Sequence, residues 1–314
     1  MTKYKPIIKW AGGKTQILDK VFEKFPTEIN NYYEPFIGGG SVFLELLNRC
    51  ENNKIQLVGT CYLNDKNKEL INMYQVVQNH IELLIKQLEK IKLIYFEAPM
   101  IEYKPRYKYQ VDLNKDISEY IKLGKSYVYY YYRAIYNNLN ININNLNDRI
   151  ISAALLIFLN KTCFRGIYRE GPNGFNVPFG NYLEPSIFNP EELKRLNLLL
   201  NKYKITFTNN DFNYYCLNIN SSNDFVYLDP PYYPLKETSF VGYKVDGFSI
   251  DDHNNLLSLC QHLDSKNIKF LQSNSYCDFN VEKYNAFNQE KILCKRRINS
   301  KNPKDTDNEI LINN

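Results

Sequence analysis

Short apolar runs alternate with stretches whose apolar residues recur at helical spacing, both at the start and at the end of this chain. The run Phe225–Leu228 is typical of a buried strand, whereas apolar positions from Val42 to Leu47 have the helical period. Strands are expected at 32–36, 56–64, 205–207, 225–228 and 269–272, and helices at 17–25, 41–49 and 66–78. Alternating strands and helices predict an α/β fold with a doubly wound, Rossmann-like sheet.

The stretch from 76 to 195 interrupts this alternation. It is predicted to be mainly helical, with helices at 81–93, 117–137 and 148–161, and then a β-hairpin or extended loop at 162–182. We therefore expect a sheet domain formed by residues 1–75 and 196–314, with residues 76–195 as an inserted domain.

Composition narrows the classes of function. The 314 residues are 44% hydrophobic and carry a formal net charge of +5, which fits a nucleic-acid partner without requiring one. The 7 cysteines include no Cys-x-x-Cys pair and only 3 histidines are present, so neither a metal site nor a disulfide framework is expected. With no apolar leader and no run near the ~18 apolar residues of a membrane span, we expect a cytoplasmic protein. The abundant Asn, Lys, Ile and Tyr indicate coding bias in an AT-rich genome.

The sequence Asp229-Pro230-Pro231-Tyr232 directly follows the expected strand 225–228. The Asp229 carboxylate and the Pro230 carbonyl are two acceptors that suit the two N–H groups of an exocyclic amine on a nucleobase. Proline fixes φ and lacks an N–H, so the turn presents acceptors rigidly. The Tyr232 ring suits stacking on a base taken out of a duplex. An ordinary loop after a strand is the alternative.

Two glycine-rich segments also favour a ligand site. Residues 33–41 indicate a strand, a glycine turn and a helix start, where backbone N–H groups are available to a ligand. The spacing is not the dinucleotide pattern, and Ile8 stands where a phosphate loop ending at Gly13-Lys14 needs glycine. Asp65 ends another expected strand, where it either accepts from ribose hydroxyls or caps the next helix.

These motifs, in this order, resemble the alpha-group adenine-N6 DNA methyltransferases, the Dam family. The resemblance covers almost the whole chain, and it rests on the segments 9–14, 33–41, 64–65, 175–180, 229–232 and 309–312. It implies a Rossmann-like methyltransferase domain, with 76–195 as the target-recognition domain. It also implies transfer of a methyl group from S-adenosylmethionine to N6 of a flipped adenine in duplex DNA, by direct displacement and without a metal.

The resemblance also implies roles for individual residues. The catalytic residues are Asp229, Pro230, Pro231 and Tyr232. The cofactor-binding residues are Trp10, Ala11, Gly12, Lys14, Glu34, Pro35, Phe36, Gly38, Gly40, Asp65 and Asp229. The DNA-binding residues are Lys9, Arg165, Tyr168, Arg169, Asn176, Lys295, Arg296 and Arg297. Core packing for Trp10, phosphate or Glu170 contacts for the arginines, and a solvated run at 295–297 are the competing interpretations.

Several alternatives stay open at the level of sequence. The loop after Arg169 differs from that of Dam, with Glu170-Gly171 in place of Tyr-Asn, so GATC and CATG are both candidate motifs. Cytosine N4 is disfavoured because Asp, not Ser, precedes Pro-Pro-Tyr. RNA adenine, a catalytically silent DNA-binding protein and a bifunctional restriction protein are further alternatives. A cognate restriction endonuclease is a candidate partner, the cell could be bacterial or the host of a virus or mobile element, and no oligomer is implied.

Overall fold

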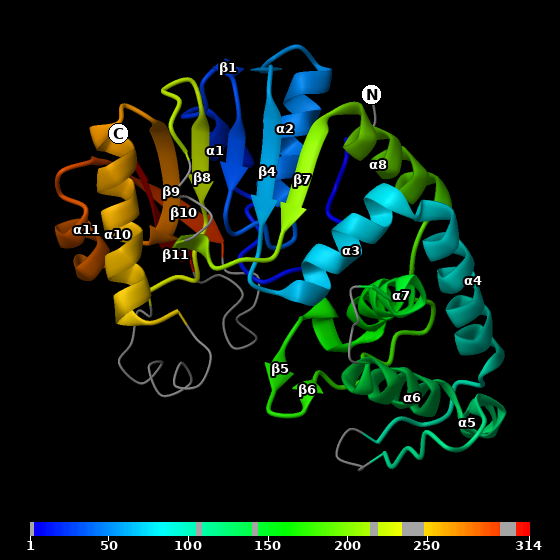
Figure 1. The fold of residues 1–314 in the computed structure, drawn as a ribbon. Coiled ribbons are helices and arrows are strands. Elements are labelled where there is room, and N and C mark those ends of the chain that lie inside the picture. Colours follow the sequence, from blue (N-terminus) through cyan, green and yellow to red (C-terminus); the bar gives the residue numbers. More distant parts are fainter. Residues whose placement is uncertain (1–2, 105–108, 140–143, 214–218, 234–247, 296–305) are drawn as a thin grey trace. The chain divides into compact units, whose positions relative to one another are not determined.

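A computed structural model describes residues 3–104, 109–139, 144–213, 219–233, 248–295 and 306–314 (Figure 1). Within these ranges, seven strands form one sheet in the order β10-β11-β9-β8-β2-β4-β7. The bounds are β2 Tyr32–Glu34, β4 Thr60–Asn64, β7 Lys204–Thr208, β8 Phe225–Leu228, β9 Lys269–Ser275, β10 Asn288–Lys295 and β11 Thr306–Asn313. The first five of these strands are parallel to one another, and β11 runs antiparallel to both β9 and β10.

The order of the strands reverses in the middle of the sheet. From β2 the chain adds β4 and then β7 on one side, and from β8 it adds β9 on the other side. The point of reversal therefore lies between β2 and β8, whose residues pair in register, Tyr32 with Phe225 and Tyr33 with Val226. In open α/β sheets, ligands bind beyond the carboxyl ends of the strands at such a point.

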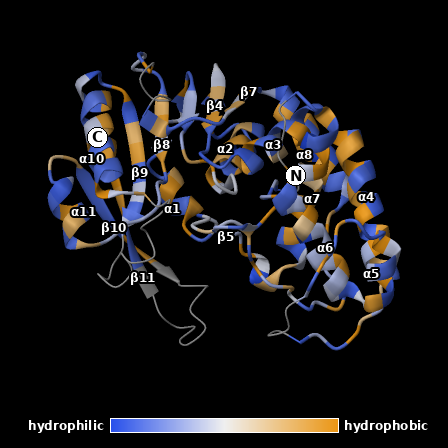
Figure 2. Cartoon of the chain, turned by 60° about the horizontal axis from the view of Figure 1, so that its bottom comes forward, coloured by the Kyte–Doolittle hydropathy of each residue, from blue (hydrophilic) through white to orange (hydrophobic). Residues whose placement is uncertain are grey.

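Helices cover both faces of the sheet, as a doubly wound fold requires. On one face, Val226 and Leu228 pack in a cluster with Leu256 and Leu263 of α10 (Ile250–Ser265). The alternate residues of β8 face the opposite way, where the rings of Phe225 and Tyr227 lie near that of Phe25, which follows α1 (Leu18–Phe22). Figure 2 shows hydrophobic positions along β8 and β9. All four side chains of β8 are buried, which explains its continuous apolar run. The predicted fold class is confirmed.

The expected strand 56–64 is in fact two short strands. β3 (Gln56–Leu57) pairs with β1 (Glu28–Ile29), whereas β4 joins the large sheet. The break falls at Gly59, whose N–H donates to the Asn30 carbonyl at 2.7 Å. A Cβ on Gly59 would lie only 2.6 Å from that oxygen, so the close approach of two backbones ends the strand.

A second group of helices packs around α7 (Leu146–Thr162), which is buried on nearly all sides and contacts α3 (Lys68–Asn79), α4 (Ile81–Glu97) and α6 (Lys125–Asn138). The expected helix 117–137 is divided. α5 (Ile117–Leu123) ends at Gly124, whose φ of 101° no helix allows, and α6 begins after it. Helix α8 (Pro190–Lys202) was not among the predicted elements.

The remaining short elements are α2 (Ser41–Glu51), the 3-10 turn η1 (Phe164–Gly166), the strand pair β5 (Glu170–Gly171) and β6 (Gly174–Phe175), and α11 (Asp278–Lys283). The chain forms two compact units. The sheet unit contains residues 1–4, 14–66 and 203–314, and the helical unit contains residues 5–13 and 67–202. Residues 5–13, 67–75 and 196–202 thus belong to the helical unit, whereas the predicted boundaries assigned them to the sheet domain.

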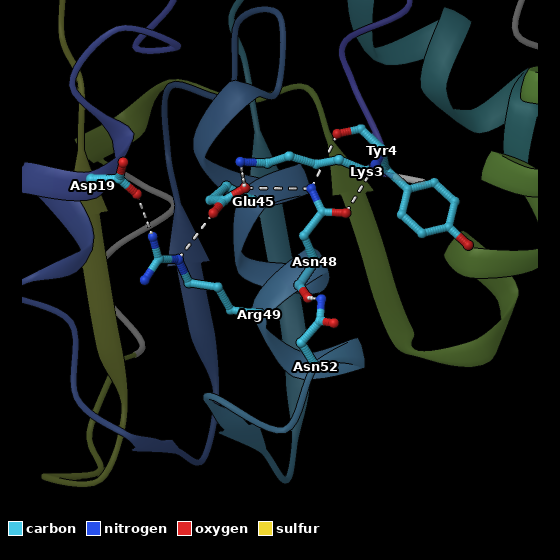
Figure 3. A network of polar contacts seen from close by, with 7 residues as sticks. All are labelled: Lys3, Tyr4, Asp19, Glu45, Asn48, Arg49 and Asn52. Carbon is cyan, nitrogen blue, oxygen red and sulfur yellow. Dashed lines mark hydrogen bonds and ion pairs between the residues drawn. The ribbon is translucent and has the colours of Figure 1, made fainter. Parts of the chain in front are cut away.

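A polar network joins the first described residues of the sheet unit to α2 (Figure 3). The Asn48 amide accepts from the Tyr4 N–H at 2.9 Å and donates to the Tyr4 carbonyl at 3.1 Å. The buried Glu45 carboxylate binds both Lys3 Nζ at 2.7 Å and Arg49 Nε at 3.0 Å. These contacts fix the start of the chain and the buried face of α2, whose amino end borders the glycine turn.

Asp224 joins the amino ends of β2 and β8. Its substitution therefore tests the stability of the fold separately from any function. One carboxylate oxygen of this buried residue accepts from Asn30 Nδ2 and from the backbone and side-chain nitrogens of Asn31. We expect Asp224→Ala to destabilise the sheet unit by about 2–3 kcal/mol, because three donors lose their acceptor. Thermal unfolding should show a midpoint roughly 5 °C lower. Asp224→Asn keeps an oxygen acceptor and should therefore lower the unfolding midpoint less. Equal midpoints for Asp224→Ala and wild type would show that these hydrogen bonds do not stabilise the sheet unit.

Candidate functional site

The carboxyl ends of β2 and β4 hold the glycine turn 35–40 in place. The Ile37 N–H donates to the Asn64 carbonyl at 2.9 Å, and the Gly38 N–H donates to Asp65 Oδ2 at 2.9 Å. Gly38 and Gly40 have φ values of 49° and 72°, which side-chain-bearing residues rarely adopt. The turn therefore depends on these two glycines and brings its backbone next to the Asp65 carboxylate.

Asn64 is the residue that sequence reasoning undervalued at this edge of the sheet. Its Nδ2 donates to the carbonyls of Pro35 and Asn210, and its Oδ1 accepts from Thr208 Oγ1 and the Asn210 N–H. The side chain is 1% exposed, and every hydrogen-bonding position of its amide is used. One amide thus joins the ends of β2, β4 and β7, and an Asn directly before the strand-end Asp was the signal in the sequence.

Asp229 lies at the end of β8, beside the end of β2. Lys14 Nζ contacts Asp229 Oδ1 at 2.7 Å, and the two side chains are only 2% and 18% exposed. Burial raises the pKa of the Asp229 carboxyl to about 6, against the lowering effect of the Lys14 ammonium. Asp229 is therefore ionised at neutral pH but is a stronger base than an exposed carboxylate.

The other residues of the strand-end motif surround this ion pair. Pro230 is buried and Pro231 is exposed. The Lys14 ammonium lies 4.8 Å from the centre of the Tyr232 ring, within range of a cation–π contact. The Lys14 backbone N–H donates to Ser41 Oγ at 3.0 Å, so the start of α2 positions the lysine. Lys14, expected at a cofactor, thus pairs with the expected catalytic carboxylate.

A second acidic side chain, Glu34, lies near Asp229. Glu34 is 2% exposed and accepts the Tyr32 hydroxyl at 2.7 Å, and burial holds the pKa of Glu34 well above its usual range. The charges of Asp229 and Asp65 raise this pKa further, whereas Lys14 opposes them. Asp229 and Asp65 therefore both act on Glu34, and their negative charges at this edge favour a cationic ligand.

An aromatic pair borders the same strand ends. The ring of the predicted residue Phe36 lies 5.1 Å from that of Phe212, centre to centre, and both rings lie near Phe248. Phe212 follows β7 and was not predicted to belong to the site. An apolar ring against the glycine turn suits a flat, partly apolar ligand group.

In the helical unit, the amide of Asn160 joins two segments that were predicted to contact DNA. Asn160 Oδ1 accepts from the Lys9 N–H at 2.9 Å, and Nδ2 donates to the carbonyls of Lys9 and Gly166 at 2.8 and 3.1 Å. A Cβ on Gly166 would lie 2.9 Å from Lys9 Cδ, so glycine permits this approach. Lys9 is exposed and Asn160 is buried. Sequence reasoning missed Asn160.

The expected recognition residues cluster along the same loop. The Trp10 and Tyr168 rings stack with their centres 4.6 Å apart, and the Tyr168 hydroxyl bonds to Glu170. Arg169 Nε donates to Asn176 Oδ1 at 2.6 Å across the β5–β6 hairpin. Trp10 therefore packs on a residue of the loop, and both Arg169 and Asn176 are exposed.

Arg165 occupies a turn with a φ of 61°, unusual for a residue with a side chain. Its N–H donates to the Tyr182 hydroxyl at 2.8 Å, which holds the turn, and its side chain is exposed. Ala11 and Gly12 are exposed in the helical unit. Lys295 ends β10, and Arg296 and Arg297 lie outside the described residues.

The described residues form neither a candidate metal site nor a membrane-spanning helix. Their His, Cys, Asp and Glu side chains form no group of three or more that could bind a metal ion. Among the same residues, every helix is too short or too polar to cross a bilayer.

The ion pair at the end of β8 gives a direct test. Because Lys14 lowers the pKa of Asp229, Lys14→Gln should raise that pKa further above about 6. Carboxyl-carbon NMR titration of protein labelled at aspartate measures this value. Lys20→Gln removes a surface lysine that pairs with Glu23 and should leave the Asp229 titration unchanged. An unchanged midpoint in Lys14→Gln would mean that the pair does not form in solution.

Comparison with known proteins agrees with this geometry. The family of D12 class N6 adenine-specific DNA methyltransferases matches residues 10–298. Type II methyltransferase M.MjaIII of Methanocaldococcus jannaschii is 36% identical, over 99% of each chain. Type II methyltransferase M1.LlaDCHI of Lactococcus lactis subsp. cremoris is 31% identical, over 95% of this chain and 90% of its own. A DNA adenine methylase of Haemophilus influenzae is 29% identical, over 96% of this chain and 90% of its own.

The family match covers residues 10–298, and the relatives align over nearly the full chain. Strand-end carboxylates, the glycine turn and the Asp-Pro-Pro-Tyr motif all lie within the matched residues. The chain therefore belongs to the D12 class of N6 adenine-specific DNA methyltransferases.

Proposed function

We propose that the carboxyl ends of β2, β4 and β8 are where this methyltransferase transfers a methyl group from S-adenosylmethionine to N6 of a flipped adenine. The observation that carries this proposal is Asp229. It is a largely buried carboxylate at the reversal point of the sheet, next to a proline carbonyl and to the Tyr232 ring. These groups match the needs of an exocyclic amine, which offers two N–H donors and one face for stacking.

The residues of the sheet unit fit S-adenosylmethionine. Asp65, held by the Gly38 N–H, suits the ribose hydroxyls, and the Phe36–Phe212 pair suits the adenine ring of the cofactor. Glu34, Pro35 and Gly40 form the surrounding turn. The Asp229 carboxylate favours the positive sulfonium. We also propose that three residues of the helical unit contact the cofactor, namely Trp10, Ala11 and Gly12.

Catalysis by these residues is a matter of positioning and charge. S-adenosylmethionine, when bound, supplies an electrophilic methyl group. Asp229 Oδ and the Pro230 carbonyl accept the two N–H groups of adenine N6 and draw its lone pair out of conjugation with the ring. As the nitrogen gains a bond and positive charge, the Asp229 carboxylate stabilises that charge and accepts the departing proton. Tyr232 stacks on the base and offsets part of the cost of flipping it.

The helical unit is proposed to read the DNA sequence. Arg165 and Arg169 suit bidentate contacts to guanine edges, and Lys9, Tyr168 and Asn176 lie on the connected segments. The segment 295–297 is proposed to contact phosphates. A GATC- or CATG-like motif is the expected target. We propose a restriction endonuclease as partner, because two relatives are named type II methyltransferases. We also propose that the protein acts on DNA inside the cell.

The first experiment is modification sequencing of DNA from cells that lack adenine methylation and express the protein. We expect N6-methyladenine in one short motif from wild type, and none from Asp229→Ala, because the amine then loses its acceptor. Asp251→Ala removes an exposed aspartate at the start of α10 and should leave methylation intact. Methylation by Asp229→Ala at the wild-type level would refute the assigned role, and methylation of RNA alone would change the substrate.

The Asn160 amide generates a test of sequence recognition. Asn160→Leu should lower the preference for the target motif over unrelated DNA roughly tenfold or more, because Lys9 and the turn at Arg165 lose their common anchor. Competition binding on both duplexes measures the ratio. Asn138→Leu, at the exposed end of α6, serves as the control. If Asn160→Leu folds and keeps the wild-type ratio, the amide has no part in recognition.

The pKa of Asp229 predicts a pH dependence. Its folded-state pKa of about 6 lies above the ordinary value of 3.8, so protonation inactivates the acceptor as pH falls through about 6. Single-turnover methylation should therefore be constant above pH 7 and decline tenfold per pH unit well below 6. A profile that stays flat to pH 5 would show that ionised Asp229 is not required.

A further inference from the structure

The last strand of the sheet delivers one carboxylate to this site. Because β11 is antiparallel to β9, its first half lies at the edge where the parallel strands end, and Glu309 pairs with Ser275 at the end of β9. On the other side Glu309 pairs with Ile292 of β10. Its backbone is thus held between two strands, so its side chain starts from a fixed point.

Glu309 accepts the hydroxyl hydrogen of Tyr232, at 2.7 Å from Oε2. Hydrogen bonds from O–H groups to carboxylates are short and stronger than those between neutral groups. The two prolines fix the backbone before Tyr232, but the torsions of its side chain determine the plane of the ring. The contact with Glu309 anchors the far end of that ring, and the Lys14 ammonium lies over the ring at 4.8 Å.

We propose that Glu309 is a positioning residue of the methyl-transfer site, which holds the Tyr232 ring in the orientation that stacks on the flipped adenine. This inference rests on the proposed role of Tyr232. Glu309 acts through the tyrosine hydroxyl, and it need not touch the base or the cofactor.

The charge of Glu309 gives a second, separable effect. Asp229 faces Lys14, Glu309, Tyr227 and Glu34, and the negative charge of Glu309 raises the pKa of Asp229. Glu309→Gln keeps an oxygen that accepts the Tyr232 hydroxyl but removes this charge. The acid limb of the rate profile should therefore move to lower pH, which loss of folding or packing would not cause.

Three single variants, Glu309→Gln, Glu309→Leu and Tyr232→Phe, separate orientation from charge. The assay is single-turnover transfer of labelled methyl groups to unmethylated DNA. Glu309→Leu and Tyr232→Phe each remove the same hydrogen bond, from opposite ends. Each should lower the rate about tenfold, which corresponds to one charge-assisted hydrogen bond lost in the transition state. The double variant should be no slower than the slower single variant, because both act on one contact. Glu290→Gln on β10 changes a partly exposed glutamate and should stay within twofold of wild type.

Orientation itself can be read with 2-aminopurine in place of the target adenine, in the motif found by sequencing. Its fluorescence reports flipping and stacking, so Glu309→Leu and Tyr232→Phe should leave the flipped base brighter than wild type does. A wild-type rate and wild-type fluorescence in both variants would overturn the proposal. If Glu309→Leu does not fold, Tyr232→Phe decides alone, since it leaves β11 unchanged. Absence of transfer by wild type would instead refute the assigned site.

Discussion

The ion pair between Lys14 and Asp229 is the interaction on which the polar edge of the sheet depends. The lysine is almost removed from water and the aspartate is largely buried, so each charge stabilises the other. The lysine reaches the carboxylate because the start of α2 holds its backbone and the glycine turn beside it is fixed to β4. The proposed catalytic carboxylate is therefore held by a contact between distant parts of the chain.

In the proposed mechanism, the same pair lets one aspartate serve both as acceptor and as base. Burial alone would raise the pKa of Asp229 further and weaken it as an ionised acceptor, whereas full exposure would make it a weaker base. Lys14 lowers its pKa, while burial and Glu309 raise it. The balance keeps the carboxylate ionised near neutrality, with a pKa of about 6 that suits the proposed acceptance of a proton.

Asparagine side chains connect segments that secondary structure leaves apart. Asn48 binds the backbone N–H and carbonyl of Tyr4, and Asn160 does the same for Lys9. Asn64 uses every position of its amide at three strand ends. An amide offers the donor and acceptor of a backbone peptide, so it pairs with an isolated stretch of chain as a neighbouring strand would. Residues whose abundance indicated only coding bias thus include several that hold the fold together.

Sequence was sufficient for features that depend on local pattern. Apolar runs ending in Asp or Glu placed Glu34, Asp65 and Asp229 at strand ends, and the confirmed fold brings those ends to one edge. Features that depend on contacts between distant residues were beyond it. The strand break at Gly59 depends on a close approach of two backbones, and the helix break at Gly124 depends on a positive φ. The neighbouring residues in the sequence indicate neither. The Lys14–Asp229 pair and the amide of Asn160 likewise join residues far apart in the chain, and the functional roles remain predictions.

The order of the strands also has a consequence for how the chain acquires its structure during synthesis. β10 is made before β11, yet among the described strands it pairs only with β11, which lies between it and β9. When β10 leaves the ribosome, its partner does not yet exist, and the edge of β9 is still open. The sheet beyond β9 therefore cannot be completed until β11 has been made, because β11 pairs with both β9 and β10.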